Sequence, residues 1–284
     1  MIGQIDRIRE LEKLNIAEKN YGLSKIAAVT SGKGGTGKTF FAANFAFQFA
    51  RSKKVLLIDM DFNLSNIHLL FNVNPLKTLN SYFESKSLFG EIISKYNSNL
   101  DIIFGDAGII TDSRPTIYQI ERMFEELNKL STKYDLIVID LGAGVSEENL
   151  FVLSKSQTKI IVTNPEPTAL MDAYVVIKLL KNNKSNDSIY IAINRCADDS
   201  EGKQSYNNLK SAVDHFLKVS INFLAEIPES TEVRKSIIDQ KLFAEQNKSN
   251  SVINSFNASV SKINKIRQVL NINQPLVPSS SISI

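Results

Sequence analysis

The segment SGKGGTGKT, Ser31 to Thr39, decides the fold, and it lies between the apolar stretches KIAAVT and FFAANFAFQFA. From Gly32 to Thr39 it satisfies the pattern GxxxxGK[ST], which holds phosphate where a β-strand leads into an α-helix. Glycines let successive backbone N–H groups turn toward an anion, and the helix N-terminus adds the positive end of its dipole. The sequence therefore predicts a strand, a phosphate-binding loop and a helix in succession.

Short runs of aliphatic and β-branched residues alternate with longer amphipathic stretches through the rest of the chain. This alternation is typical of a parallel sheet covered by helices. We predict one α/β domain over residues 24–270, with a doubly wound, mostly parallel sheet of seven or eight strands and helices on both faces, as in P-loop NTPases. The predicted strands are 25–30, 54–59, 100–104, 135–140, 159–163, 188–193 and 221–227, and the clearest helices are 38–51, 116–131, 168–181 and 203–218.

The composition excludes several classes of protein. The 284 residues are 43% apolar and 22% charged, as in a soluble globular protein. Cys196 is the single cysteine, so an internal disulfide and a zinc or iron–sulfur site built on cysteines are excluded. The most apolar stretch, residues 40–50, is far shorter than the roughly 20 residues that span a bilayer, and residues 1–13 do not resemble a secretory signal. We expect a cytoplasmic protein.

Two further motifs supply carboxylates for a nucleotide site. Asp59 ends the predicted strand VLLID and Asp61 lies two residues further on, and Asp140 ends the strand in YDLIVIDLGAG, residues 134–144. Carboxylates at the ends of parallel strands face the ligand crevice of an open α/β sheet. We expect Asp59 and Asp140 to support Mg²⁺ together with the hydroxyl of Thr39, and Lys38 to contact the β- and γ-phosphates of ATP. The residues assigned to the nucleotide in this loop are Gly34, Gly35, Thr36, Gly37, Lys38, Thr39 and Phe40.

The loop has an additional lysine, Lys33, five residues before Lys38. The sequence KGGTGKT resembles the deviant Walker A motif of the MinD/ParA superfamily. This resemblance implies that Lys33 crosses to the nucleotide of a second subunit, so that ATP joins two chains in a dimer. It also implies that Asp61 orients the water that attacks the γ-phosphate. An ordinary surface lysine is the alternative for Lys33.

The same resemblance assigns the adenine contacts. Asn194 and Arg195 follow the strand IYIAI, where the superfamily places an asparagine against the base, and Pro228 in FLAEIPEST resembles the segment that covers its other side. An asparagine at the end of a strand is also common as a simple turn residue.

Two stretches are similar to the FlhG branch of the superfamily, the regulators of flagellar number and placement. TNPEPTALMDAY, Thr163 to Tyr174, is similar to the EPT…DAY stretch of FlhG, and the turn GAG replaces the proline common in MinD. FlhG proteins also have an activating motif close to DQAxxLR that stimulates a partner GTPase, FlhF. GQIDRIR keeps Gln4 and Arg9 of that motif, whereas Gly3 and Ile5 depart from it. GTPase activation by the amphipathic arm of residues 1–23 is therefore a hypothesis, and a helix that only packs on the domain is the alternative.

The C-terminal part of the chain is basic. The net charge is +3, but residues 234–284 alone have a charge of +5. These basic residues can bind an anionic surface such as lipid or DNA, or they form a solvated helix face. Apolar residues at helical spacing predict a helix here. The resemblance implies that it lies on the membrane in the ATP-bound dimer, and the alternative is the last core helix of the domain. Residues 271–284 are expected to form a flexible tail. The apolar residues are Val252, Ile253, Phe256, Val260, Ile263 and Ile266.

The sequence as a whole predicts a slow, Mg²⁺-dependent ATPase of the MinD/ParA class, most like FlhG. It would cycle between a monomer and an ATP-bound homodimer, act with an FlhF-like GTPase and make peripheral contact with the membrane. A ParA-type ATPase that partitions DNA is the first alternative. A small-molecule kinase or ligase of the P-loop class is the second, although His68 and His215 lie apart from any acid–base cluster.

Overall fold

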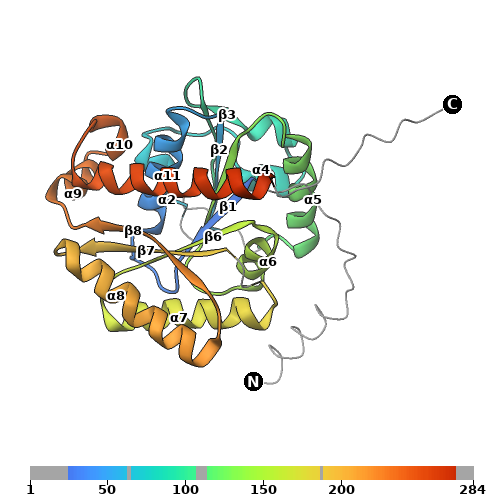
Figure 1. Cartoon of the computed structure of the whole chain (residues 1–284). Helices are drawn as coiled ribbons and strands as arrows, with labels where there is room; N and C mark the ends of the chain where they lie inside the picture. The colour runs from blue at the N-terminus through green and yellow to red at the C-terminus, as the bar shows by residue number, and fades with distance from the viewer. Residues whose placement is uncertain (1–24, 63–64, 107–113, 186–187, 273–284) are drawn as a thin grey trace.

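The computed structural model describes residues 25–62, 65–106, 114–185 and 188–272. These residues form an eight-stranded sheet in the order β3-β4-β2-β5-β1-β6-β7-β8 (Figure 1). Strand β3 pairs antiparallel with β4, and the other neighbours are parallel. The strands are β1 (Ile26–Thr30), β2 (Val55–Met60), β3 (Ser94–Lys95), β4 (Leu100–Ile103), β5 (Leu136–Leu141), β6 (Thr158–Thr163), β7 (Ile189–Cys196) and β8 (Ile221–Pro228).

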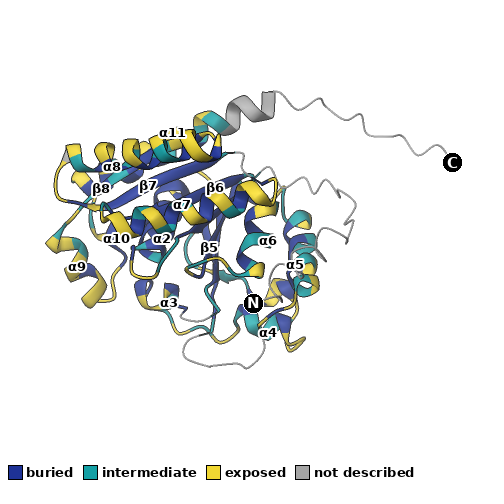
Figure 2. Cartoon of the chain, turned by 90° about the horizontal axis from the view of Figure 1, so that it is seen from below, coloured by how far each residue is buried: buried dark blue, intermediate teal, exposed yellow. Residues whose placement is uncertain are grey.

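Helices cover both faces of the sheet and leave its central strands buried between them (Figure 2). One face packs against α2 (Lys38–Ala50), α3 (Ile67–Leu70), α10 (Phe243–Gln246) and α11 (Ser251–Ile272). The other packs against α4 (Leu79–Phe83), the 3₁₀ turn η1 (Phe89–Ile92), α5 (Ile117–Lys129), α6 (Glu147–Lys155), α7 (Pro167–Asn182), α8 (Asp199–Ala212) and the π-helical turn η2 (Val213–Leu217). Helix α9 (Thr231–Ile238) follows β8.

The predicted fold class is confirmed, and the seven predicted strands are present with small changes at their ends. The eighth strand, β3, has only two residues, too few for an alternating pattern to be visible in the sequence. The predicted helix 203–218 begins earlier, at Asp199, because the Asp198 carboxylate accepts hydrogen bonds from the backbone N–H groups of Ser200 and Glu201 and caps the helix. It ends at Ala212 and continues as the π-helical turn.

The apolar face of α11 is a core face. Val252, Ile253 and Phe256 are fully buried against α2 and β8, and Phe256 packs on the ring of Phe41. The Lys262 ammonium donates to the backbone carbonyls of the β8 edge, at 2.9 Å from Leu224 O. Up to Ile266 this face is therefore occupied within the chain, as expected for a last core helix.

None of the helices in the described residues is long and apolar enough to cross a membrane. The predicted N-terminal arm with Gln4 and Arg9, and the predicted tail apart from residues 271–272, lie outside the described residues.

Candidate nucleotide site

The phosphate-binding loop lies at the centre of the sheet. Strand β1 pairs with β5 on one side and β6 on the other. It leads into α2 on one face, whereas β5 and β6 lead into α6 and α7 on the opposite face. Such a change of face opens a crevice at the carboxyl ends of the strands. Gly35 and Gly37 have φ values of 79° and 88°, a left-handed conformation that favours glycine, and they turn the chain into α2.

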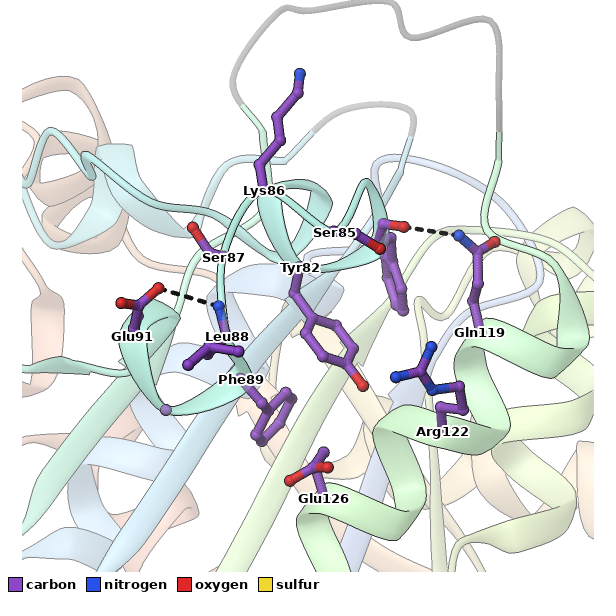
Figure 3. A pocket seen from close by; sticks show the side chains of 12 residues that line it. Tyr82, Ser85, Lys86, Ser87, Leu88, Phe89, Glu91, Gln119, Arg122 and Glu126 are labelled. Carbon is purple, nitrogen blue, oxygen red and sulfur yellow. Dashed lines mark hydrogen bonds between the residues drawn. The ribbon is translucent and has the colours of Figure 1, made fainter.

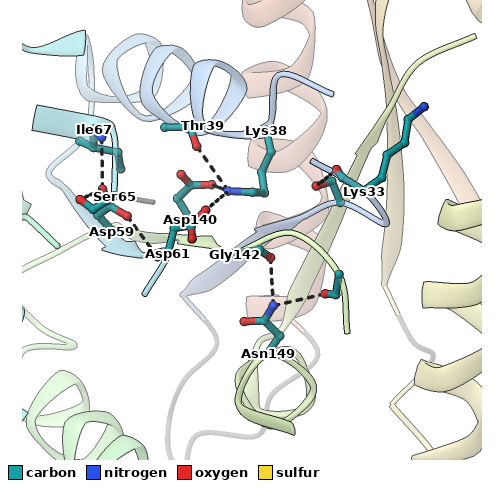
Figure 4. A network of polar contacts seen from close by, with 12 residues as sticks. Lys33, Lys38, Thr39, Asp59, Asp61, Ser65, Ile67, Asp140, Gly142 and Asn149 are labelled. Carbon is teal, nitrogen blue, oxygen red and sulfur yellow. Dashed lines mark hydrogen bonds and ion pairs between the residues drawn. The ribbon is translucent and has the colours of Figure 1, made fainter. Parts of the chain in front are cut away.

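A buried cluster of charges lies directly under the loop (Figure 4). The Nζ of Lys38 is 2.9 Å from Oδ1 of Asp140, 3.7 Å from Oδ2 of Asp61 and 3.3 Å from Oγ1 of Thr39. Lys38 is only 6% exposed and Asp140 is fully buried. Burial lowers the pKa of Lys38, but Asp140 and Asp61 outweigh it and raise that pKa above its ordinary value. The lysine is therefore charged.

The cluster contains the three predicted carboxylates. Asp59 on β2 is the register partner of Asp140 on β5, so parallel pairing brings the two strand ends side by side. One oxygen of Asp59 accepts hydrogen bonds from the Ser65 hydroxyl at 2.7 Å and the Ile67 N–H at 3.1 Å, and the other accepts from the Asp61 N–H at 3.1 Å. Burial and the neighbouring Asp140 raise the pKa of Asp59 to about 7. Asp59 thus orients the turn that carries Asp61.

Two of the three predicted metal ligands, Thr39 and Asp140, fit magnesium, whereas both oxygens of the third, Asp59, accept hydrogen bonds within the chain. Asp140 Oδ2 is buried and has no hydrogen-bond partner among the described residues, and burial raises the pKa of this carboxyl although Lys38 opposes the rise. With the Thr39 hydroxyl it offers the oxygen ligands that Mg²⁺ prefers. Within the described residues, no group of three or more His, Cys, Asp and Glu side chains could hold a metal ion.

Asn149 on α6 belongs to the site although the sequence analysis did not select it. Its side-chain amide donates to the carbonyls of Gly142 at 2.9 Å and Gly144 at 3.2 Å (Figure 4). The Gly144 N–H in turn donates to the Ser31 carbonyl at 2.9 Å, which ties the GAG turn to the phosphate loop. Gly144 adopts φ 83°, which explains a glycine there. No motif points to Asn149, because it lies in the first turn of a helix, nine residues after Asp140.

The residues expected to contact adenine share one pocket with the loop. This pocket has a volume of about 330 Å³ and is lined by Gly37, Phe40, Asn194, Arg195 and Pro228, among others. The Asn194 amide donates to the Thr36 carbonyl at 2.8 Å, and a Cβ on Gly37 would lie 2.1 Å from that amide nitrogen. Asn194 therefore supports the loop directly, and Gly37 leaves room for it.

Lys33 points away from the buried cluster (Figure 4). Its Nζ is 2.7 Å from Oε2 of Glu166 and 3.2 Å from Oγ1 of Thr168, at the start of α7. Gly32 beside it packs so closely on α7 that a Cβ would lie 2.4 Å from the Asp172 carbonyl carbon. The EPT…DAY stretch therefore borders the phosphate loop.

A larger hollow of about 560 Å³ lies elsewhere, between α4, η1 and α5 (Figure 3). It is lined by Tyr82, Leu88, Arg122 and Glu126, among others, and Gln119 spans one side by donating to the Phe83 carbonyl at 2.8 Å. None of the predicted site residues lines it.

The sheet order, the glycine loop at the end of β1 and the lysine–carboxylate cluster under it define a nucleotide-binding protein of the P-loop class. Residues 27–243 match the family model of the CobQ/CobB/MinD/ParA nucleotide binding domain, and the chain belongs to this family.

Two curated relatives are similar to most of the chain. The chain is 30% identical over 243 residues to the flagellum site-determining protein YlxH of Helicobacter pylori, covering 84% of this chain and 82% of the relative. It is 27% identical over 218 residues to the antiactivator FleN of Pseudomonas aeruginosa, covering 76% and 78%. Among solved structures, the septum site-determining protein MinD from Pyrococcus horikoshii, complexed with Mg-ADP, has the same fold with a TM-score of 0.70. That match is 23% identical and covers 86% of this chain and 98% of the MinD chain.

Proposed function

We propose that this chain is a cytoplasmic, Mg²⁺-dependent ATPase that alternates between a monomer and an ATP-bound homodimer and regulates the number or placement of flagella. The observation that carries the ATPase proposal is the buried cluster in which Lys38 lies 2.9 Å from Asp140 and 3.7 Å from Asp61. A buried lysine with three carboxylates around it, at the mouth of a glycine loop, is suited to bind phosphates and a divalent cation.

The roles of the residues follow from their positions. When the nucleotide binds, the Lys38 ammonium would leave Asp140 and contact phosphate oxygens instead. Thr39 and Asp140 would hold Mg²⁺, which supplies neutralisation of the phosphate charge, and Asp59 would keep the turn of Asp61 in place. Asp61, at the edge of the cluster with its side chain 14% exposed, would orient the attacking water. Asn194, Arg195 and Pro228 would surround the adenine.

Nucleotide binding and hydrolysis can be tested separately. Wild-type protein should hydrolyse ATP slowly and only with Mg²⁺. Lys38→Ala should lose binding of a fluorescent ATP analogue, whereas Asp61→Ala should keep binding and lose hydrolysis. Lys210→Ala, which removes an exposed i,i+4 ion pair with Asp214, is the control, and it should change neither nucleotide binding nor hydrolysis. Hydrolysis that continues in Asp61→Ala would contradict the role of that residue.

The dimer can be tested in the Asp61→Ala background, where ATP is not consumed. Light scattering should give twice the monomer mass with ATP and the monomer mass with ADP. Lys33→Ala should stay monomeric with both nucleotides if Lys33 reaches the second subunit. A mass that does not depend on the nucleotide would refute the cycle.

The flagellar role is supported by the similarity to YlxH and FleN over most of the chain. We expect this chain, and not its Lys38→Ala variant, to restore flagellar placement in a Helicobacter pylori strain without YlxH. Partnership with an FlhF-like GTPase rests on Gln4 and Arg9. Adding the chain to such a GTPase should speed GTP hydrolysis, and the double variant Gln4→Ala and Arg9→Ala should lose that effect.

The same preparations test the alternatives. ATP-dependent, salt-sensitive binding to DNA would favour the ParA-type partitioning function. Hydrolysis that needs a small-molecule acceptor would favour a kinase or ligase. ATP-dependent binding to anionic vesicles would support the peripheral membrane contact.

A further inference from the structure

The stretch EPT at the start of α7 has no role in the nucleotide chemistry proposed above. Glu166 is the residue before α7, Pro167 occupies its first turn, and Thr168 follows. Both polar side chains of this stretch contact one group, the ammonium of Lys33, at 2.7 Å and 3.2 Å. Lys33 at the same time lies directed away from Lys38 and its carboxylates (Figure 4). The stretch therefore determines where Lys33 lies in an isolated subunit.

The backbones that carry the two partners are held together closely. Gly32 packs on the backbone of Asp172, so the loop and α7 touch without an intervening side chain. The Ser31 hydroxyl donates to the Lys33 carbonyl at 2.9 Å, and the Ser31 carbonyl accepts from the Gly144 N–H. Since both backbones are fixed, forming the pair restricts only the side chains of Lys33 and Glu166. The hydrogen bond from Lys33 also lowers the pKa of Glu166 below its ordinary value.

We propose that Glu166 and Thr168 are positioning residues that hold Lys33 against its own subunit and thereby oppose dimerisation until ATP is bound. This inference rests on the proposed dimer, in which Lys33 reaches the nucleotide of a second copy of this chain. The Lys33 side chain cannot lie along its own α7 and extend to the other subunit at once. Each subunit must therefore give up the contacts with Glu166 and Thr168 before the dimer closes.

The size of the effect follows from the exposure of the pair. Side-chain exposures of 33% for Lys33 and 60% for Glu166 place it among surface ion pairs. One such pair shifts an equilibrium by less than about fivefold, and dimer formation breaks two of them. We expect Glu166→Gln to lower the dimer dissociation constant about three- to tenfold with ATP present. Thr168→Val should lower it by a smaller factor.

The experiment is sedimentation equilibrium of the full chain with ATP and Mg²⁺ in the Asp61→Ala background. Glu84→Gln is the matched control, because the pair of Glu84 with Lys86 has the same 2.7 Å separation and lies on another part of the chain. The control should leave the dissociation constant unchanged. The urea midpoint of the monomer should be the same in all variants, so a change in dimerisation cannot come from a change in folding.

Two outcomes separate this inference from the proposed function. If the Asp61→Ala background forms no ATP-dependent dimer, the proposed cycle fails. If that dimer forms but Glu166→Gln dimerises as weakly as the background or more weakly, the inference is overturned and the cycle stands. As a further check, Glu166→Gln added to Lys33→Ala should change nothing, because the group that it restrains is then missing.

Discussion

Replacing Lys38 by methionine should destabilise the protein without nucleotide, although the apolar stem of the side chain is retained. Lys38 is 6% exposed and its Nζ is 2.9 Å from a carboxylate that is fully buried. The variant leaves Asp140 without its cation and with Asp59 and Asp61 close by. Removing one partner of a buried ion pair costs about 3–5 kcal/mol, because an uncompensated charge stays buried. We expect a loss in the free energy of unfolding within that range.

The double variant Lys38→Met and Asp140→Asn separates the pair from its surroundings. Once the carboxylate is neutral, the missing ammonium matters much less, so the double variant should be more stable than Lys38→Met alone. The coupling between the two positions should be at least about 2 kcal/mol. Lys210→Met is the control for loss of an exposed lysine, and it should leave the stability nearly unchanged.

Urea unfolding followed by circular dichroism measures the wild type, Lys38→Met, Asp140→Asn, the double variant and the Lys210→Met control, with a chelator and no nucleotide in the buffer. Two results would refute the reasoning. The first is a loss below about 1 kcal/mol in Lys38→Met, and the second is a double variant whose loss equals the sum of the single losses. Either would mean that the lysine and the carboxylate are solvated in solution rather than paired.

Three further predictions test other parts of the site. Asn149→Ala removes the donor to two carbonyls of the GAG turn, so it should lower the free energy of unfolding by about 1–3 kcal/mol and reduce kcat. Asn149→Asp keeps the shape of the side chain but loses the donor, and it should have the same two effects. A normal kcat in both variants would exclude a positioning role for Asn149. Gly32→Ala places a methyl group 2.4 Å from the α7 backbone and should destabilise by about 1–3 kcal/mol in urea, whereas Gly34→Ala, with nothing within 4 Å, should change stability much less. Burial, with Glu226 nearby, raises the pKa of the Cys196 thiol to about 12. A thiol reagent at pH 8.5 should therefore label the native protein very slowly and the urea-unfolded protein quickly. Equal labelling rates would show that the end of β7 is open to solvent.

Most of the fold could be predicted from local sequence patterns. The seven long strands and the helices α2, α5 and α7 have periodic or continuous apolar residues that depend little on the rest of the chain. Strand β3 and the start of α8 were not predicted correctly, because two residues give no periodicity and because a cap depends on the orientation of the Asp198 side chain. The sequence left two roles open for the apolar face of α11, a core helix or a helix on the membrane. The contacts of α11 with α2 and β8 favour the core helix.

The sequence alone determined the class of this protein, because the phosphate loop is a continuous segment whose glycines, lysine and threonine act through neighbouring backbone groups. Only the tertiary structure decided how distant residues meet. Parallel pairing of β2 with β5 puts Asp59 beside Asp140, and the packing of α7 on Gly32 brings Glu166 to Lys33, 133 positions away. The physical reason is that strand register and helix packing are set by burial of the whole core, which no local pattern encodes.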